Sequence, residues 1–249
     1  MKIAGETIVI TGGASGLGLE FARQLASLTA EVWALDNDPD ALERATRELD
    51  GAARLVRCDV GDEAQVVETV RAIEQQSGGI SVLINNAAIL SDQALVSKLG
   101  GRIRKHTLAA WHETLRCNLT SVFLMAREVA GAMIERRRGG LIVNISSISR
   151  HGNPGQTAYA ASKAAIDALT VTWSQELAPY GIRVVGIAPG FVHTPMTQRV
   201  PPVFLEQIRE STPLKRFGSL EEFGHTIQYV IETDYMNGRT LELDGGLRF

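Results

Sequence analysis

The stretch TIVITGGASGLG, residues 7–18, is followed at once by the apolar periodic segment Leu19 to Leu28. The β-branched run at 7–10 predicts a strand, and the later segment predicts a helix. Glycines between a strand and a helix let backbone N–H groups and the helix N-terminus approach a pyrophosphate. This order predicts a dinucleotide site made by Gly12, Ser15, Gly16, Leu17 and Gly18. The alternative is a turn that only connects the two elements.

Six further β-branched runs alternate with stretches of helical period, at residues 31–35, 54–57, 80–84, 141–145, 182–187 and 240–243. Parallel strands joined through helices predict a Rossmann-type, doubly wound α/β fold with a seven-stranded parallel sheet and helices on both faces. Ligands of such sheets bind at the carboxyl ends of the strands. No internal repeat or linker divides the chain, so residues 1–249 are expected to form a single domain.

The 249 residues carry 25 Lys and Arg against 28 Asp and Glu, a formal net charge of -3. This balance supplies no basic field for a nucleic acid or an anionic membrane, so a small-molecule substrate is expected. No apolar run is expected to reach the length of a membrane span. Cys58 and Cys117 lack metal-ligand spacing and are expected to be free thiols in a reduced compartment, the cytoplasm. The five histidines also lack ligand spacing, so no metal site is predicted.

Asp36 ends the second predicted strand, where a carboxylate can accept hydrogen bonds from an adenosine ribose and repel a 2′-phosphate. No Arg or Lys stands at Ser15 or Asn37, so NAD is favoured over NADP. The alternative role for Asp36 is to cap the following helix together with Asp38. Asp59, after the third predicted strand, is expected to meet the adenine through its side chain or through the N–H of Val60; a plain loop cap explains it nearly as well.

Tyr159 and Lys163 lie four residues apart in a segment of helical period, so both side chains emerge on one face. An ammonium about 4 Å from the phenol would lower its pKa by up to about three units at an effective dielectric of roughly 20. This geometry predicts a tyrosine that exchanges protons near neutral pH, while desolvation opposes the shift. The alternative is a buried tyrosine beside a surface lysine.

These residues stand in one order with further motifs: Asn85-Asn86-Ala87-Ala88, Asn118, Ser146-Ser147, Pro189-Gly190 and Gly245-Gly246. In that order the chain resembles the short-chain dehydrogenase/reductase family over essentially its whole length. It is most similar to 3-oxoacyl-thioester reductases and their secondary-alcohol dehydrogenase relatives. The resemblance implies nicotinamide contacts from Val192 and Thr194, beside Pro189 and Gly190, and a homotetramer formed partly through helices 120–137 and 158–177. It also implies that Asn85 to Ala88, Asn86 among them, stabilise the sheet and shape the adenosine side.

The resemblance also assigns catalytic roles. Asn118 would bind a water linked to Lys163, although its surroundings are also consistent with a helix boundary. Strand position favours Ser147 as the hydroxyl that holds the substrate oxygen, whereas the family's usual spacing from Tyr159 favours Ser146. We expect Tyr159 to take the hydroxyl proton while a hydride passes to the nicotinamide.

The substrate is not determined by these motifs. A predicted hairpin insertion at 94–105 carries Lys98, Arg102, Arg104 and Lys105. These cations would meet the phosphates of a coenzyme A or acyl-carrier substrate; the alternative is a solvated loop or a subunit contact. Residues 191–217 are expected to form an apolar lid. The leading hypothesis is an NAD-dependent dehydrogenase of a secondary alcohol, either a 3-hydroxyacyl thioester or an aryl alcohol. The alternatives are an NADPH-dependent 3-oxoacyl-thioester reductase and a non-catalytic dinucleotide sensor.

Overall fold

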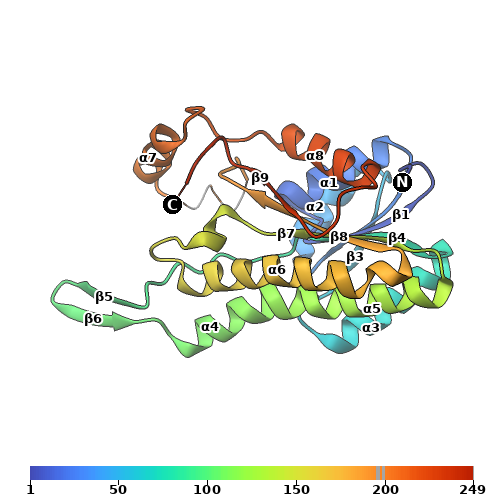
Figure 1. Ribbon diagram of the computed structural model, residues 1–249. Coiled ribbons are helices and arrows are strands. Elements are labelled where there is room, and N and C mark those ends of the chain that lie inside the picture. Colours follow the sequence, from blue (N-terminus) through green and yellow to red (C-terminus); the bar gives the residue numbers. More distant parts are fainter. Residues whose placement is uncertain (195–196, 198–199, 249) are drawn as a thin grey trace.

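The computed structural model describes residues 1–194, 197 and 200–248, and it contains the expected parallel sheet (Figure 1). The strand order is β3-β2-β1-β4-β7-β8-β9, and every neighbouring pair is parallel. The strands are β1 Thr7–Thr11, β2 Glu31–Asp36, β3 Arg54–Arg57, β4 Ile80–Asn85, β7 Gly140–Ile145, β8 Ile182–Pro189 and β9 Thr240–Leu243. All seven coincide with predicted runs, so the doubly wound fold is confirmed.

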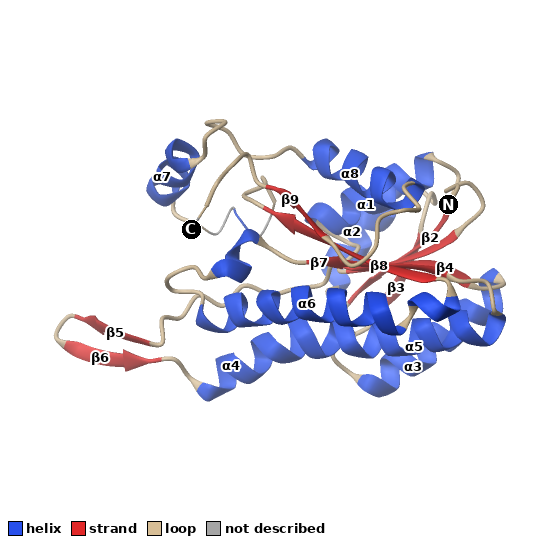
Figure 2. Cartoon of the chain, in the orientation of Figure 1, coloured by secondary structure: helices blue, strands red, loops and turns tan. Residues whose placement is uncertain are grey.

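Helices cover both faces of the sheet (Figure 2). One layer holds α1 Gly16–Ser27, α2 Pro39–Leu49 and α8 Leu220–Glu232; the other holds α3 Glu63–Ser77, α5 Ser121–Arg136 and α6 Thr157–Glu176. Two separate apolar clusters lie between the sheet and these layers; Phe21 and Phe223 belong to one, and Met125 and Met133 to the other. The sheet is therefore buried on both sides, as its β-branched strands require.

Two elements stand outside this sandwich. The hairpin of β5 Val96–Leu99 and β6 Arg102–Lys105 projects from the body of the molecule, and α7 Pro202–Ser211 lies within the predicted lid segment (Figure 1). Gly100 and Gly101 form the hairpin turn with φ of 57° and 75°, a conformation that favours glycine at both positions. Of the apolar lid residues, Met196 lies outside the described residues.

The helical run Leu108–Arg136 joins α4 Leu108–Leu115 to α5 through a π-helical turn at Arg116–Thr120. By length and composition this run could cross a membrane, because an 18-residue stretch within it has a mean hydropathy of 1.2, so the expectation that no segment reaches that length is wrong. Half of this apolar stretch is buried in the structure, and α5 packs against α3 and β4. Core helices of soluble proteins can have the same length and composition, so the run is weak evidence for a membrane span.

Candidate active site

A cleft of about 300 Å³ opens at the carboxyl ends of the strands, where β1 and β4 lie side by side and the strand order reverses. All but two of the predicted site residues line it: Gly12, Ser15, Gly16, Leu17, Asp36, Asp59, Val60, Asn86, Ser147, Tyr159, Lys163, Pro189, Gly190, Val192 and Thr194. The two exceptions are Gly18 and Asn118, which do not line the cleft but contact residues that do, Gly12 and Ile89. Sequence reasoning missed Thr197, which also lines the cleft and donates to the carbonyl of Val192 at 2.7 Å.

The glycine loop leaves no room for side chains where it meets the neighbouring strand loop. A Cβ on Gly12 would lie 2.9 Å from the Cα of Ala87, and a Cβ on Gly18 would lie 2.1 Å from the carbonyl oxygen of Gly12. The Asn86 side-chain amide donates to the carbonyls of Thr11 and Gly12, each at 3.0 Å, and fixes the loop. Ser15 begins α1 without capping it by its side chain, so the helix N-terminus faces the cleft. These features fit a pyrophosphate.

Asp36 is held at the edge of the cleft by backbone donors. Its carboxylate accepts from the N–H of Ala14 at 3.2 Å and from that of Asp38 at 3.1 Å. The cap of α2 is Asp38 itself, whose side chain accepts from the first-turn N–H groups of Asp40 and Ala41. Asp36 therefore does not cap α2, and its carboxylate stays beside the glycine loop, where a ribose would lie.

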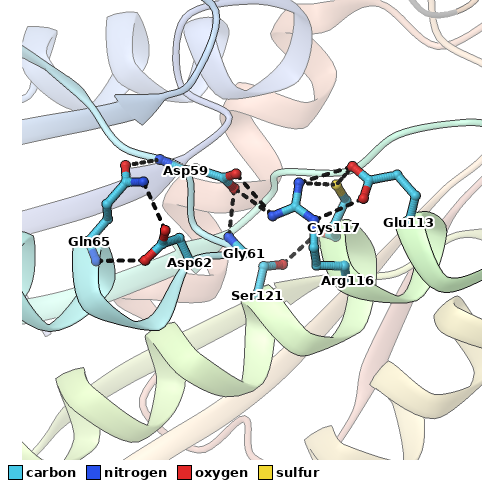
Figure 3. Close-up of polar contacts among 8 residues, drawn as sticks. All are labelled: Asp59, Gly61, Asp62, Gln65, Glu113, Arg116, Cys117 and Ser121. Atoms are coloured by element: carbon cyan, nitrogen blue, oxygen red, sulfur yellow. Dashed lines mark hydrogen bonds and ion pairs between the residues drawn. The ribbon is translucent and has the colours of Figure 1, made fainter.

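Asp59 is engaged by a charged cluster that the sequence did not indicate (Figure 3). Both Asp59 carboxylate oxygens accept from Nη1 of Arg116 at 3.0 Å, and one also accepts from the N–H of Gly61 at 2.9 Å. Arg116 donates in addition to both oxygens of Glu113, each at 2.9 Å, which lowers the pKa of Glu113 to about 2. Burial raises the pKa of the neighbouring Cys117 thiol to about 12, so this cleft-lining cysteine is neutral. Arg116 thus links the loop after β3 to the π turn.

The catalytic candidates converge on the opposite end of the cleft. Tyr159 and Lys163 lie one turn apart on α6, and the Ser147 side chain lies close enough to the Tyr159 hydroxyl to affect its pKa, while its own Oγ accepts from the N–H of Ser149 at 3.1 Å. Ser146 points elsewhere, since its hydroxyl donates to the backbone carbonyl of Lys163 at 3.2 Å. The Lys163 ammonium, 2% exposed, donates to the Ile145 carbonyl at 2.8 Å and lies 5.6 Å from the centre of the Tyr159 ring.

This geometry corrects the expected acidity of Tyr159. Desolvation raises the pKa of Tyr159 to about 12, although the Ser147 side chain opposes the rise. The same desolvation lowers the pKa of Lys163 to about 8. The expected lowering fails because burial outweighs an ammonium whose hydrogen bond goes to a carbonyl rather than to the phenol. Without a bound ligand, Tyr159 is a neutral proton donor.

Asn118 lies in the π turn and is fully buried. Its side chain donates to the carbonyl of Ile89 at 2.9 Å and accepts from the N–H of Ile89 at 2.8 Å. The expected boundary between two helices is a π turn within one continuous helical run, Leu108–Arg136. The expected water link between Asn118 and Lys163 stays a prediction. An asparagine pair also supports the sheet: Asn85 donates to Asn144, which donates to Thr170 on α6, each at 3.0 Å.

Comparison with known proteins identifies the family of this chain. Residues 6–202 match the family described as short chain dehydrogenase. The chain is 38% identical to the 3-oxoacyl-[acyl-carrier-protein] reductase FabG of Thermotoga maritima, covering 99% of both chains, and 34% identical to the 3-hydroxyacyl-CoA dehydrogenase type-2 of Rattus norvegicus, covering 99% of this chain and 97% of the relative. A short-chain type dehydrogenase/reductase from Mycobacterium marinum superposes with a TM-score of 0.89 at 31% identity, covering 98% of this chain and 96% of that one. The chain therefore belongs to the short-chain dehydrogenase/reductase family and is an oxidoreductase.

Proposed function

We propose that this oxidoreductase uses NAD(H) to interconvert a secondary alcohol and a ketone, with a 3-hydroxyacyl thioester as the substrate. The observation that carries the cofactor choice is the Asp36 carboxylate, fixed by two backbone N–H groups beside the glycine loop. A 2′-phosphate there would meet a negative charge that has no basic neighbour at Ser15 or Asn37. The printed names of the two relatives, an acyl-carrier-protein reductase and an acyl-CoA dehydrogenase, support the thioester.

The chain's own residues perform the proton chemistry. Tyr159 donates its proton to the ketone oxygen in reduction and accepts it back in oxidation. Ser147, whose side chain lies beside that hydroxyl, orients the substrate oxygen between the two groups. Lys163 places a buried ammonium next to them, and Asn118 fixes the strand loop behind it. Bound nicotinamide supplies or accepts the hydride.

The test of the cofactor assignment compares kcat/KM for NADH and NADPH with a 3-oxoacyl thioester. We expect at least a tenfold preference for NADH, and Asp36→Asn should reduce that preference because it removes the repulsive charge and keeps the side-chain shape. A preference of the unmodified protein for NADPH would favour the alternative, an NADPH-dependent 3-oxoacyl-thioester reductase. The absence of turnover across thioesters, aryl alcohols and other ketones would favour a dinucleotide sensor.

A further inference from the structure

The β5–β6 hairpin is a cationic arm without acidic residues. Residues 93–107 contain Lys98, Arg102, Arg104 and Lys105 but no Asp or Glu. Every residue of both strands is exposed, and among the described residues none of the four cations forms an ion pair. A solvated loop could be equally charged, so the arrangement of the apolar residues and the anchoring of the arm decide what it does.

The strand register places cations and large aliphatic side chains together on both faces of the arm. Val96 pairs with Lys105 and Lys98 with Ile103 on one face, while Leu99 pairs with Arg102 and Ser97 with Arg104 on the other. Val96, Leu99 and Ile103 are 55%, 61% and 60% exposed. A two-stranded hairpin gains little stability by itself, so exposed aliphatic residues here need another explanation than folding. Arginine beside exposed apolar side chains is typical of a protein–protein interface.

The base of the arm is fixed beside the start of α6, the helix that carries Tyr159 in its first turn. Gln93 forms an isolated bridge with Gln156, the residue just before α6 and three positions before Tyr159. The N–H of His106 donates to the carbonyl of Leu95 at 2.9 Å, and that of Thr107 donates to the Gln93 side chain at 3.1 Å. A macromolecule bound along the arm would therefore lie next to the element that carries the catalytic tyrosine.

We propose that the hairpin docks an acidic carrier protein that presents the acyl thioester to the cleft. This inference rests on the proposed thioester substrate and names its carrier. Charge complementarity favours an acidic partner, because the arm is locally positive in a chain whose net charge is -3. A carrier protein fits better than coenzyme A, because the cations lie on both faces along about 10 Å of strand instead of converging on one phosphate site. The aliphatic residues add contacts that a protein surface can bury.

The test uses one 3-oxoacyl group on three carriers: an acyl carrier protein, coenzyme A and N-acetylcysteamine. The variants are Arg102→Ser/Arg104→Ser and Lys98→Ser/Lys105→Ser, one per face. The matched control is Arg44→Ser/Arg71→Ser, two exposed arginines on α2 and α3. We expect at least one hairpin variant to lose tenfold or more in kcat/KM for the carrier-protein substrate, with less than twofold change for N-acetylcysteamine. The loss should shrink as salt rises, because the contacts are charged and exposed.

Fluorescence anisotropy of the labelled carrier protein measures docking independently of turnover. If a hairpin variant binds the carrier protein more weakly and the control variant binds it unchanged, the docking proposal is supported, even if the enzyme acts on another group than a 3-oxoacyl thioester. Equal losses on all three substrates, a loss confined to coenzyme A, or a changed oligomeric state in light scattering would overturn it. A variant with Val96–Lys105 replaced by Asn-Gly should fold, because the flanking residues Leu95 and His106 are already joined by a hydrogen bond. It should show the same selective loss, because it lacks all four cations. If N-acetylcysteamine thioesters are not turned over at all, the proposed function fails and the docking result stands separately.

Discussion

At the scale of single residues, Tyr159 is the group whose removal should stop proton transfer. Tyr159→Phe keeps the ring and loses only the hydroxyl, so we expect kcat to fall by about 10²–10⁴-fold, the usual contribution of a positioned general acid. Cofactor affinity, measured by NADH fluorescence, should change less than twofold. A variant that keeps a tenth of the activity would contradict the assigned role.

The acidity of the same hydroxyl gives a second residue-scale prediction. Tyr159 is expected to ionise near pH 12 in the ligand-free protein, because desolvation favours its neutral form. The tyrosinate absorbance of the unmodified protein minus that of Tyr159→Phe should show this one transition. Oxidised cofactor, with its positive nicotinamide, should move the transition to lower pH. A ligand-free midpoint near neutral pH would restore the expectation drawn from spacing alone.

Residue identity and spacing predicted which side chains meet in the cleft, but not their energetics. The strand end placed Ser147 toward Tyr159 because a strand fixes the direction of its last side chains, whereas the intervening loop can vary in length. The pKa of Tyr159 could not be predicted this way. This pKa depends on the burial of the phenol and on the hydrogen bond that Lys163 donates to the Ile145 carbonyl. The spacing of two residues in the sequence encodes neither.

At the scale of elements, Arg116 connects the loop after β3 to the π turn, and we expect it to position the adenine side of the cleft. Arg116→Gln should raise the Kd for NADH about three- to tenfold with little change in kcat at saturating cofactor, because the loop loses its anchor far from the reacting atoms. Arg116→Lys should restore part of the affinity. In a double-mutant cycle with Asp59→Asn, the two effects should not add.

The matched control is Arg127→Gln, which removes an arginine that pairs with Glu63 and Glu128 on the exposed side of α5. It should leave the Kd for NADH unchanged. An equal rise in Kd for both arginine variants would mean that the effect is a general loss of helix stability.

Elements with local signals were predictable, and contacts between distant segments were not. Alternation, β-branching and Gly100-Gly101 are properties of short windows, so the strands and the hairpin appear near their expected bounds. The Asp59–Arg116 pair joins residues 57 positions apart, and the π turn depends on how α4 and α5 pack. No window of sequence contains that information.

At the scale of the whole molecule, we expect a homotetramer, which the family resemblance implies. The helices assigned to the interface expose Phe123 on α5 and Val171 on α6, each at 45%. Phe123→Glu or Val171→Glu should shift the mass seen by light scattering toward smaller species, because a charge cannot be buried there without a partner. Val67→Glu on α3, where the valine is 42% exposed, is the control and should leave the mass unchanged.

The low pKa of Lys163, about 8, predicts that the protein takes up protons when a ligand binds. In mildly alkaline solution the empty protein is a mixture of ammonium and free-amine forms. Any ligand that accepts a hydrogen bond from Nζ selects the ammonium form and draws a proton from the buffer. Calorimetric heats of association should therefore scale with the ionisation enthalpy of the buffer near pH 8, and this dependence should vanish in Lys163→Met.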